Sequence, residues 1–144
     1  RYGVAPRYVV YGGLVFMPLD RELMKVFGRG WAGSADRNLI WHHLYREVEQ
    51  PATVDREVVV LTRILRHPVN SQMTFPGPSA VARINGREIG GLADVLPALQ
   101  AESGPFQTVE LEGAAGFEAL DRAQAEAAHA EILKQYGIAK DKNL

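Results

Sequence analysis

The chain has 144 residues, 47% of them hydrophobic and 23% charged, and its formal net charge is −1 at pH 7. These values are typical of one folded domain with a core of its own, and they give no overall field that would favour nucleic acid or an anionic membrane. The absence of cysteine excludes disulfides, thiolate metal sites and cysteine nucleophiles. No apolar run approaches the roughly 20 residues that span a bilayer, so we expect no membrane span.

The first half of the chain begins with a predicted strand and continues with two predicted helices. Residues 7–17 are rich in β-branched and aromatic side chains, and two adjacent glycines interrupt them, which suggests a bulge or a close backbone approach. Helix-start chemistry at Asp20 predicts a helix that ends at Gly28. Apolar residues at helical spacing predict a second helix over 36–49.

The second half of the chain alternates strands and helices. A continuous apolar run predicts a strand over 56–65 that is buried on both faces, and Asn85-Gly86 predicts a hairpin. A helix is expected over 91–102, where Pro97 should kink or shorten it. The remaining predicted elements are strands over 106–112 and 116–121 and an amphipathic helix over 122–137. This order predicts a single α+β domain.

Residues that could carry chemistry occur without the spacing that chemistry needs. His42 and His43 are adjacent, so on a helix their side chains diverge by about 100° and cannot face one metal ion together. Ser34 lies in a glycine-containing loop without the pattern of a serine nucleophile, and Glu110 and Glu112 lie on one face of a predicted strand, where carboxylates are usually solvated. We therefore expect no metal, no cofactor and no catalytic residue in this chain.

Four stretches that follow one another along the chain resemble one family. They are "PRYVVYGGLVFMPLDREL" (6–23), "REVVVLTRILRHPVNSQM" (56–73), "AVARINGREIGGLADVLPAL" (80–99) and "FEALDRAQAEAAHAEILKQYGI" (117–138). Together they resemble the C-terminal PDZ-like domain of Deg/HtrA-type (protease Do-like) serine proteases. The resemblance covers nearly the whole chain. Its most specific parts are "GLVFMPL" and "ILKQYGI", whereas "INGREI" is common to PDZ domains in general.

The resemblance implies a fold, a longer parent protein and a catalytic domain separate from this one. The fold would be a PDZ-like partly open β-barrel or sandwich capped by helices, formed by residues 1–144 as one domain. A helical insertion would cover about 19–55, and a C-terminal helix about 121–137. The chain begins with Arg1, and we expect it to be a fragment of a longer trypsin-like endopeptidase. The catalytic triad would lie upstream of the fragment, because no triad residue maps here, so we expect the chain itself to be non-catalytic.

The resemblance also implies a peptide-binding site. PDZ domains add an extended peptide to a sheet edge and hold its terminal carboxylate with backbone N–H groups. The carboxylate loop of the family matches Gly13, Leu14, Val15 and Phe16, with Gly12 before them. The helix that follows the Asn-Gly hairpin would line the other side of the groove with Leu92, Val95 and Leu99. Val15 stands where the second loop glycine of the family usually sits, which distorts the expected loop because a β-branched residue resists positive φ.

Two functions fit this resemblance. The first is a non-catalytic protein-interaction domain that recognises peptide or unfolded-protein termini or docks neighbouring protomers or the protease domain. The alternative is a purely structural oligomerisation domain with a vestigial groove. Trp31, Trp41 and Tyr45 are the predicted interface residues, and a local mini-core is the other explanation for these aromatics. The sequence leaves the compartment open.

Overall fold

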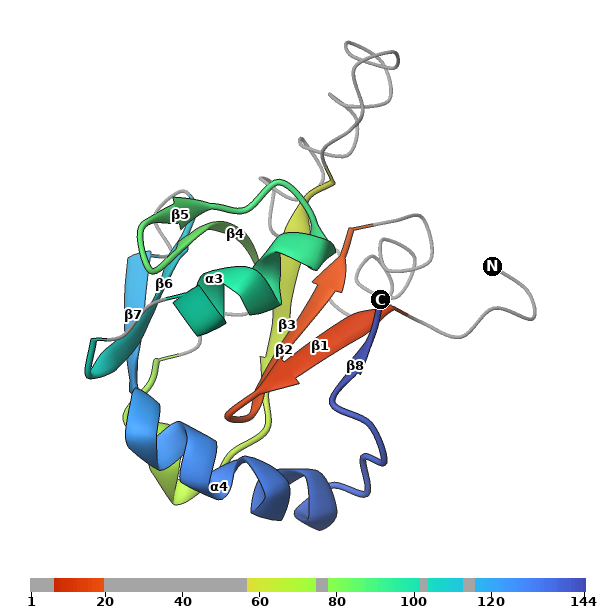
Figure 1. Cartoon of the computed structure of the whole chain (residues 1–144), viewed down its shortest axis with the longest axis vertical. Helices are drawn as coiled ribbons and strands as arrows, with labels where there is room; N and C mark the ends of the chain where they lie inside the picture. The colour runs from red at the N-terminus through yellow and green to blue at the C-terminus, as the bar shows by residue number, and fades with distance from the viewer. Residues whose placement is uncertain (1–6, 20–56, 75–77, 102–103, 113–115) are drawn as a thin grey trace, which may run out of the picture.

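A computed structural model of the chain describes residues 7–19, 57–74, 78–101, 104–112 and 116–144 (Figure 1). The helices predicted within 20–28 and 36–49, and with them Trp31, Trp41 and Tyr45, lie outside the described residues. The described strands are β1 Tyr8–Tyr11, β2 Leu14–Pro18, β3 Val59–Ile64, β4 Ser79–Ile84, β5 Arg87–Glu88, β6 Phe106–Leu111, β7 Gly116–Asp121 and β8 Lys142–Asn143. The described helices are two 3₁₀ turns, η1 Pro68–Asn70 and η2 Leu92–Asp94, and two α-helices, α3 Val95–Ala101 and α4 Arg122–Gln135.

The strands form one antiparallel sheet in the order β7-β6-β4-β3-β2-β1-β8, and β5 pairs with β4 beside this path. The register of the sheet shifts between β2 and β3 at Thr62, the additional residue on β3, and between β4 and β6 at Ala82, the additional residue on β4. Figure 1 shows α3 crossing in front of the sheet and α4 running along its lower end, from the end of β7 toward β1. The predicted α+β architecture is confirmed.

The main core lies between α3 and the inner face of the sheet. It is built from side chains that alternate along the strands and from the buried stripe of α3. Its largest fully buried members include Phe16, Leu14, Leu61, Ile84 and Leu92. A second cluster packs α4 against the opposite face of β1 and β2, with Val10, Leu65 and Ile132 buried between them. The sheet therefore has helices on both faces, which fixes β1 and β2 between α3 and α4.

The strand predicted over 7–17 is in fact two antiparallel strands. The predicted interruption at Gly12 and Gly13 is a two-residue turn that reverses the chain, and Tyr11 pairs with Leu14 across it. Gly12 has φ 55° and Gly13 has φ 94°, and positive φ at both central residues is what a type I′ hairpin turn requires. The close backbone approach that the two glycines suggested is also present, as the site below describes.

Pro97 lies in the first turn of α3, which spans fewer residues than the helix predicted over 91–102. The 3₁₀ turn η2 precedes α3, and Pro97 is the third residue of α3. A proline in the first turn of a helix gives up an N–H that has no partner within the helix. The helix predicted over 91–102 is therefore present as η2 followed by α3.

Candidate functional site

The turn between β1 and β2 is fitted closely into its surroundings. An ideal Cβ built on Gly13 would clash with Asn70 Nδ2 and would lie 2.5 Å from the Leu65 carbonyl oxygen. A Cβ built on Gly12 would lie 2.9 Å from Leu120 Cδ2 and 3.1 Å from Ala125 Cβ. Backbone conformation and available space thus both require glycine at these two positions.

Three backbone groups of the turn are hydrogen-bonded within the chain. The Gly12 N–H donates to His129 Nδ1 over 3.3 Å, and the Gly12 carbonyl accepts from Asn70 Nδ2 over 3.0 Å. The Gly13 carbonyl accepts from the Leu65 N–H over 2.6 Å. A loop that binds a carboxylate through its backbone has N–H groups that converge on the anion and are not bonded elsewhere in the chain. Here the Gly12 N–H faces an imidazole nitrogen instead.

Asn70 is the residue that holds the turn, and the sequence reasoning missed it. Its side chain is fully buried, its Nδ2 donates to the carbonyls of Gly12 and Leu65, and its Oδ1 accepts from the His67 N–H over 3.1 Å. His67 in turn caps η1, because its Nδ1 accepts from the Val69 N–H. The available sequence signal was a polar residue two positions after Pro68, which is a common feature of turns.

Both edges of β2 are occupied. β1 pairs along one edge, with Val9 opposite Phe16 and Val10 opposite Val15, and β3 pairs along the other edge. The outer edge of β1 is covered in turn by β8. Because a peptide joins a sheet through unpaired N–H and C=O groups, an added strand can pair with β2 only after β1 has left.

The predicted peptide-binding side chains separate into two sets. Leu14, Phe16, Leu92, Val95 and Leu99 come together, but in the main core, where each is at most 2% exposed. Val15 lies on the opposite face of the sheet, partly exposed, in the cluster beneath α4. The residues expected to line a groove therefore contact one another and present almost no surface to a ligand in this arrangement.

A polar network crosses the core beside the turn. The Tyr11 hydroxyl accepts from Gln107 Nε2 over 2.9 Å and donates to Glu126 Oε2 over 3.2 Å. Gln107 is 1% exposed, and it also donates to the Leu99 carbonyl and accepts from Asn85 Nδ2. Burial raises the pKa of the Tyr11 hydroxyl above its ordinary value of 10.0, because it disfavours the charged phenolate.

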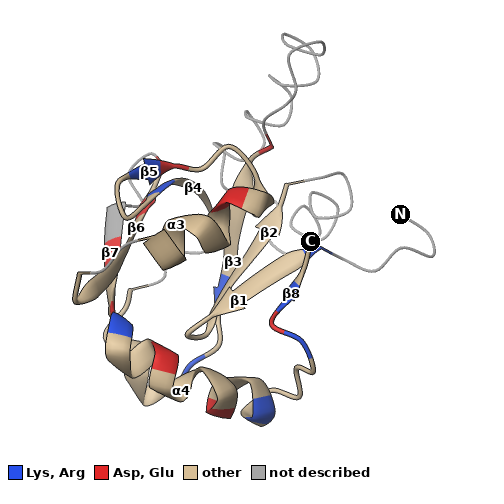
Figure 2. Cartoon of the chain, viewed as in Figure 1, with Lys and Arg blue, Asp and Glu red and all other residues tan. Residues whose placement is uncertain are grey.

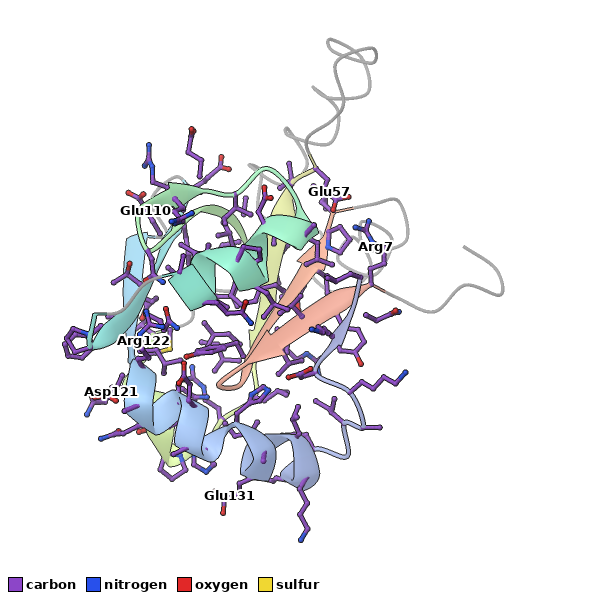
Figure 3. All side chains as sticks on the ribbon, viewed as in Figure 1. Arg7, Glu57, Glu110, Asp121, Arg122 and Glu131 are labelled. Atoms are coloured by element: carbon purple, nitrogen blue, oxygen red, sulfur yellow. The ribbon has the colours of Figure 1, made fainter. Side chains whose placement is uncertain are left out.

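Arg122 joins the start of α4 to the end of α3. Its Nε donates to the Gly104 carbonyl over 2.8 Å and its Nη1 donates to the Leu99 carbonyl over 3.0 Å. Figure 3 shows Arg122 between the two helices. Its Nη2 is buried without a hydrogen-bond partner, and Glu126 lies 4.0 Å from its Nη1. A cation at the last carbonyls of α3 is favourably placed in the field of that helix.

Residues near the C-terminus hold β1 through hydrogen bonds. The Val10 N–H donates to the Asp141 carbonyl over 2.7 Å, and the Tyr8 hydroxyl donates to the Lys140 carbonyl over 2.7 Å. His129 Nε2 lies 2.9 Å from Asp141 Oδ2. Because His129 Nδ1 accepts from the Gly12 N–H, Nε2 carries the proton and donates to the Asp141 carboxylate. One imidazole thus connects the turn, α4 and the segment that leads into β8.

The described residues contain no group of three or more His, Cys, Asp or Glu side chains placed to hold a metal ion. Among the helices that the structure describes, none is long and apolar enough to cross a membrane. The three predicted interface aromatics at 31, 41 and 45 lie outside the described residues, so their role stays a prediction.

The antiparallel sheet, the helices that pack against it and the glycine turn that leads into β2 are consistent with a PDZ-like fold. The family model described as PDZ domain matches residues 1–143, and the chain belongs to this family. No curated protein matches the chain. The predicted PDZ-like fold is confirmed. PDZ domains are interaction modules that bind peptide or protein partners, and this chain, as a member of the family, shares that class of function. Domains of this family typically have no catalytic activity.

Proposed function

We propose that this domain is a non-catalytic docking domain of a Deg/HtrA-type serine endopeptidase, and that it joins a neighbouring protomer or the protease domain. The observation that carries the docking role is the pairing of β1 on the outer edge of β2. That edge is where a PDZ domain receives a peptide strand. Because this edge is filled by the chain's own β1 and the turn is hydrogen-bonded internally, docking to another copy or to the protease domain is favoured over capture of free peptide termini.

The protease parent is supported by the four stretches described above, which follow one another over nearly the whole chain. A single domain with an inserted segment is supported by the Leu19 N–H, which donates to the Val58 carbonyl over 2.7 Å. This bond joins the residues that flank the proposed insertion. The chain would therefore leave and re-enter the domain at one point.

Recognition of peptide termini is the second candidate. The sequence Gly-Gly-Leu-Val-Phe leads into β2, and the turn η2 before α3 contacts this strand. Val95 and Leu99 of α3 are buried in the same core cluster as the β2 side chains. These are the parts that a PDZ groove uses. In this arrangement they would have to open before a ligand could enter, since β1 and the buried side chains fill the space between them.

The two candidates are separated by a peptide titration of the ¹⁵N-labelled chain followed by nuclear magnetic resonance. The ligands are hydrophobic peptides with free C-terminal carboxylates, and the same peptides with amidated ends are the control. We expect no shifts in residues 12–18 and 91–101 at millimolar peptide, because displacement of β1 opposes binding. Shifts confined to these residues and lost on amidation would instead establish terminus capture and contradict the docking proposal.

A further inference from the structure

We infer that two copies of this chain dock by exchanging β1, so that residues 8–11 of each copy pair with β2 of the other. This inference rests on the docking function proposed above and names the partner as a second copy of the same chain. It follows from the symmetry of the β1–β2 pairing, from the chemistry of the two strands and from the turn that joins them.

The pairing is symmetric about the peptide bond between Gly12 and Gly13. The partners are Val9 with Phe16, Val10 with Val15 and Tyr11 with Leu14. If the turn straightens, residues 8–16 run as one strand. Two such strands then pair antiparallel around a two-fold axis, and every residue keeps the partner type that it has in the hairpin. A closed two-fold dimer is the usual outcome of such self-complementary surfaces.

The side chains of both strands tolerate this arrangement. Neither β1 nor β2 carries a charged residue (Figure 2), so the exchanged pairing opposes no like charges. Val9 is 0% exposed and Val10 is 3% exposed, and each would enter an identical site on the other copy. β8 also pairs with β1, so the incoming strand would be bonded along both of its edges.

A second copy fits this position better than an unrelated peptide does. The Tyr11 hydroxyl bonds the buried amide of Gln107 and the carboxylate of Glu126. A strand without tyrosine at this point would leave the Gln107 N–H without that partner, and an unsatisfied buried donor costs more than the bond itself contributes. A second copy carries this tyrosine in the required register and restores the same contacts.

The turn is the element that decides between the closed and the exchanged form. Both of its glycines have positive φ, and a Cβ at position 13 clashes with Asn70 and with the Leu65 carbonyl. An extended strand accepts alanine without such strain. The substitution Gly13→Ala therefore penalises the hairpin and leaves the exchanged pairing unaffected.

The test uses a cysteine pair, Val10→Cys with Val15→Cys, in a chain that has no other cysteine. Tyr11 and Leu14 flank a two-residue turn, so the next pair is the closely spaced, non-hydrogen-bonded pair, in reach of a disulfide. The pair cross-links within one chain in the hairpin and between chains after exchange. The chain is refolded over a concentration series, oxidised, and analysed by non-reducing electrophoresis and light scattering.

We expect cross-linked dimers to increase with concentration in the parent background. In the Gly13→Ala background we expect the association constant to rise about a hundredfold, since each opened turn relieves a penalty of about tenfold and a dimer opens two. Gly86→Ala is the matched control, because Gly86 has φ 79° in the β4–β5 hairpin and no atom within 4 Å of an added Cβ. It should leave the fraction of dimer unchanged.

A folded Gly13→Ala chain that cross-links only within itself overturns the exchange, and so does an equal rise in dimer for Gly86→Ala. If Gly13→Ala does not fold, the parent series decides, because cross-links only within single chains at the highest concentration also overturn it. Dimers seen by light scattering without interchain cross-links would leave docking in place and remove exchange alone.

Discussion

Asn70 is the fully buried side chain that anchors the carbonyl side of the β1–β2 turn. It donates to the carbonyls of Gly12 and Leu65 and accepts from the His67 N–H, and no part of it is exposed. The net stability that such a hydrogen bond adds is small. Its loss costs more, because a buried carbonyl without a donor keeps its full desolvation cost.

Asn70→Ala is expected to lower the free energy of unfolding by about 2–4 kcal/mol, because two buried carbonyls lose their donor and the cap of η1 loses its partner. Urea unfolding followed by circular dichroism measures the loss. Gln72→Ala, two residues along and exposed, is the control and should change stability by less than about 0.5 kcal/mol. A loss no larger than that of the control would remove Asn70 from its anchoring role.

At the scale of elements, α3 is a helix of seven residues that depends on its neighbours. A helix this short is marginal in isolation, so packing and end contacts must hold it. Its apolar stripe supplies the packing through Val95, Ala98 and Leu99. Arg122, the first residue of α4, supplies the end contact through the Leu99 and Gly104 carbonyls.

Arg122→Ala should therefore loosen α3 more than it loosens the sheet. Loss of two charge-assisted hydrogen bonds is expected to cost about 1–3 kcal/mol. Amide hydrogen exchange should accelerate in residues 95–101 before it accelerates in β3 or β4. Arg87→Ala removes an exposed arginine on β5 and is the control. Uniform acceleration across helix and sheet would show that Arg122 supports the whole domain and not α3 in particular.

The sequence predicted the elements that carry their own local signal. The hairpin at Asn85 and Gly86, the strand β3 and the helix α4 all appear where apolar spacing and turn residues placed them. β8 was not predicted, because Lys142 and Asn143 have no strand pattern and form a strand only by pairing with β1. Local pattern does not report such tertiary pairing.

In the candidate site, too, the features with a local sequence signal were predicted and those that depend on tertiary contacts were not. Gly12 and Gly13 were singled out from the sequence, but the reversal of the chain was not, because the runs on either side are both continuously apolar and read as one strand. One residue that holds the reversal in place is Asn70, which lies 58 positions from Gly12. A contact between residues so far apart in the sequence gives no signal in a short stretch of residues. The occupied edge of β2 could therefore be recognised only from the fold.

At the scale of the whole molecule, one polar network ties the two helices to the two halves of the sheet. Tyr11 ends β1, Gln107 lies on β6, Glu126 lies on α4, and Gln107 also bonds the Leu99 carbonyl of α3. Burial raises the pKa of Tyr11, so the native state holds the phenolic proton more tightly than the unfolded chain does. Global stability is linked to that proton.

The sign of the linkage gives the last prediction. Because the pKa of Tyr11 in the folded chain lies above its unfolded value near 10.0, its contribution to stability is fully present below that pH. The contribution is lost as the pH rises through the folded pKa. Urea unfolding measured over a series from about pH 8 to pH 11 should therefore show a declining free energy of unfolding.

In Tyr11→Phe the alkaline decline should be shallower, although the variant starts from a lower stability at neutral pH because Gln107 loses a partner. The comparison separates two effects of the same hydroxyl. The offset at neutral pH measures the hydrogen bonds of the network, and the difference in slope measures the buried proton. If the free energy of unfolding declined with pH in parallel for the two proteins, the network would stabilise the fold without coupling the ionisation of Tyr11 to folding.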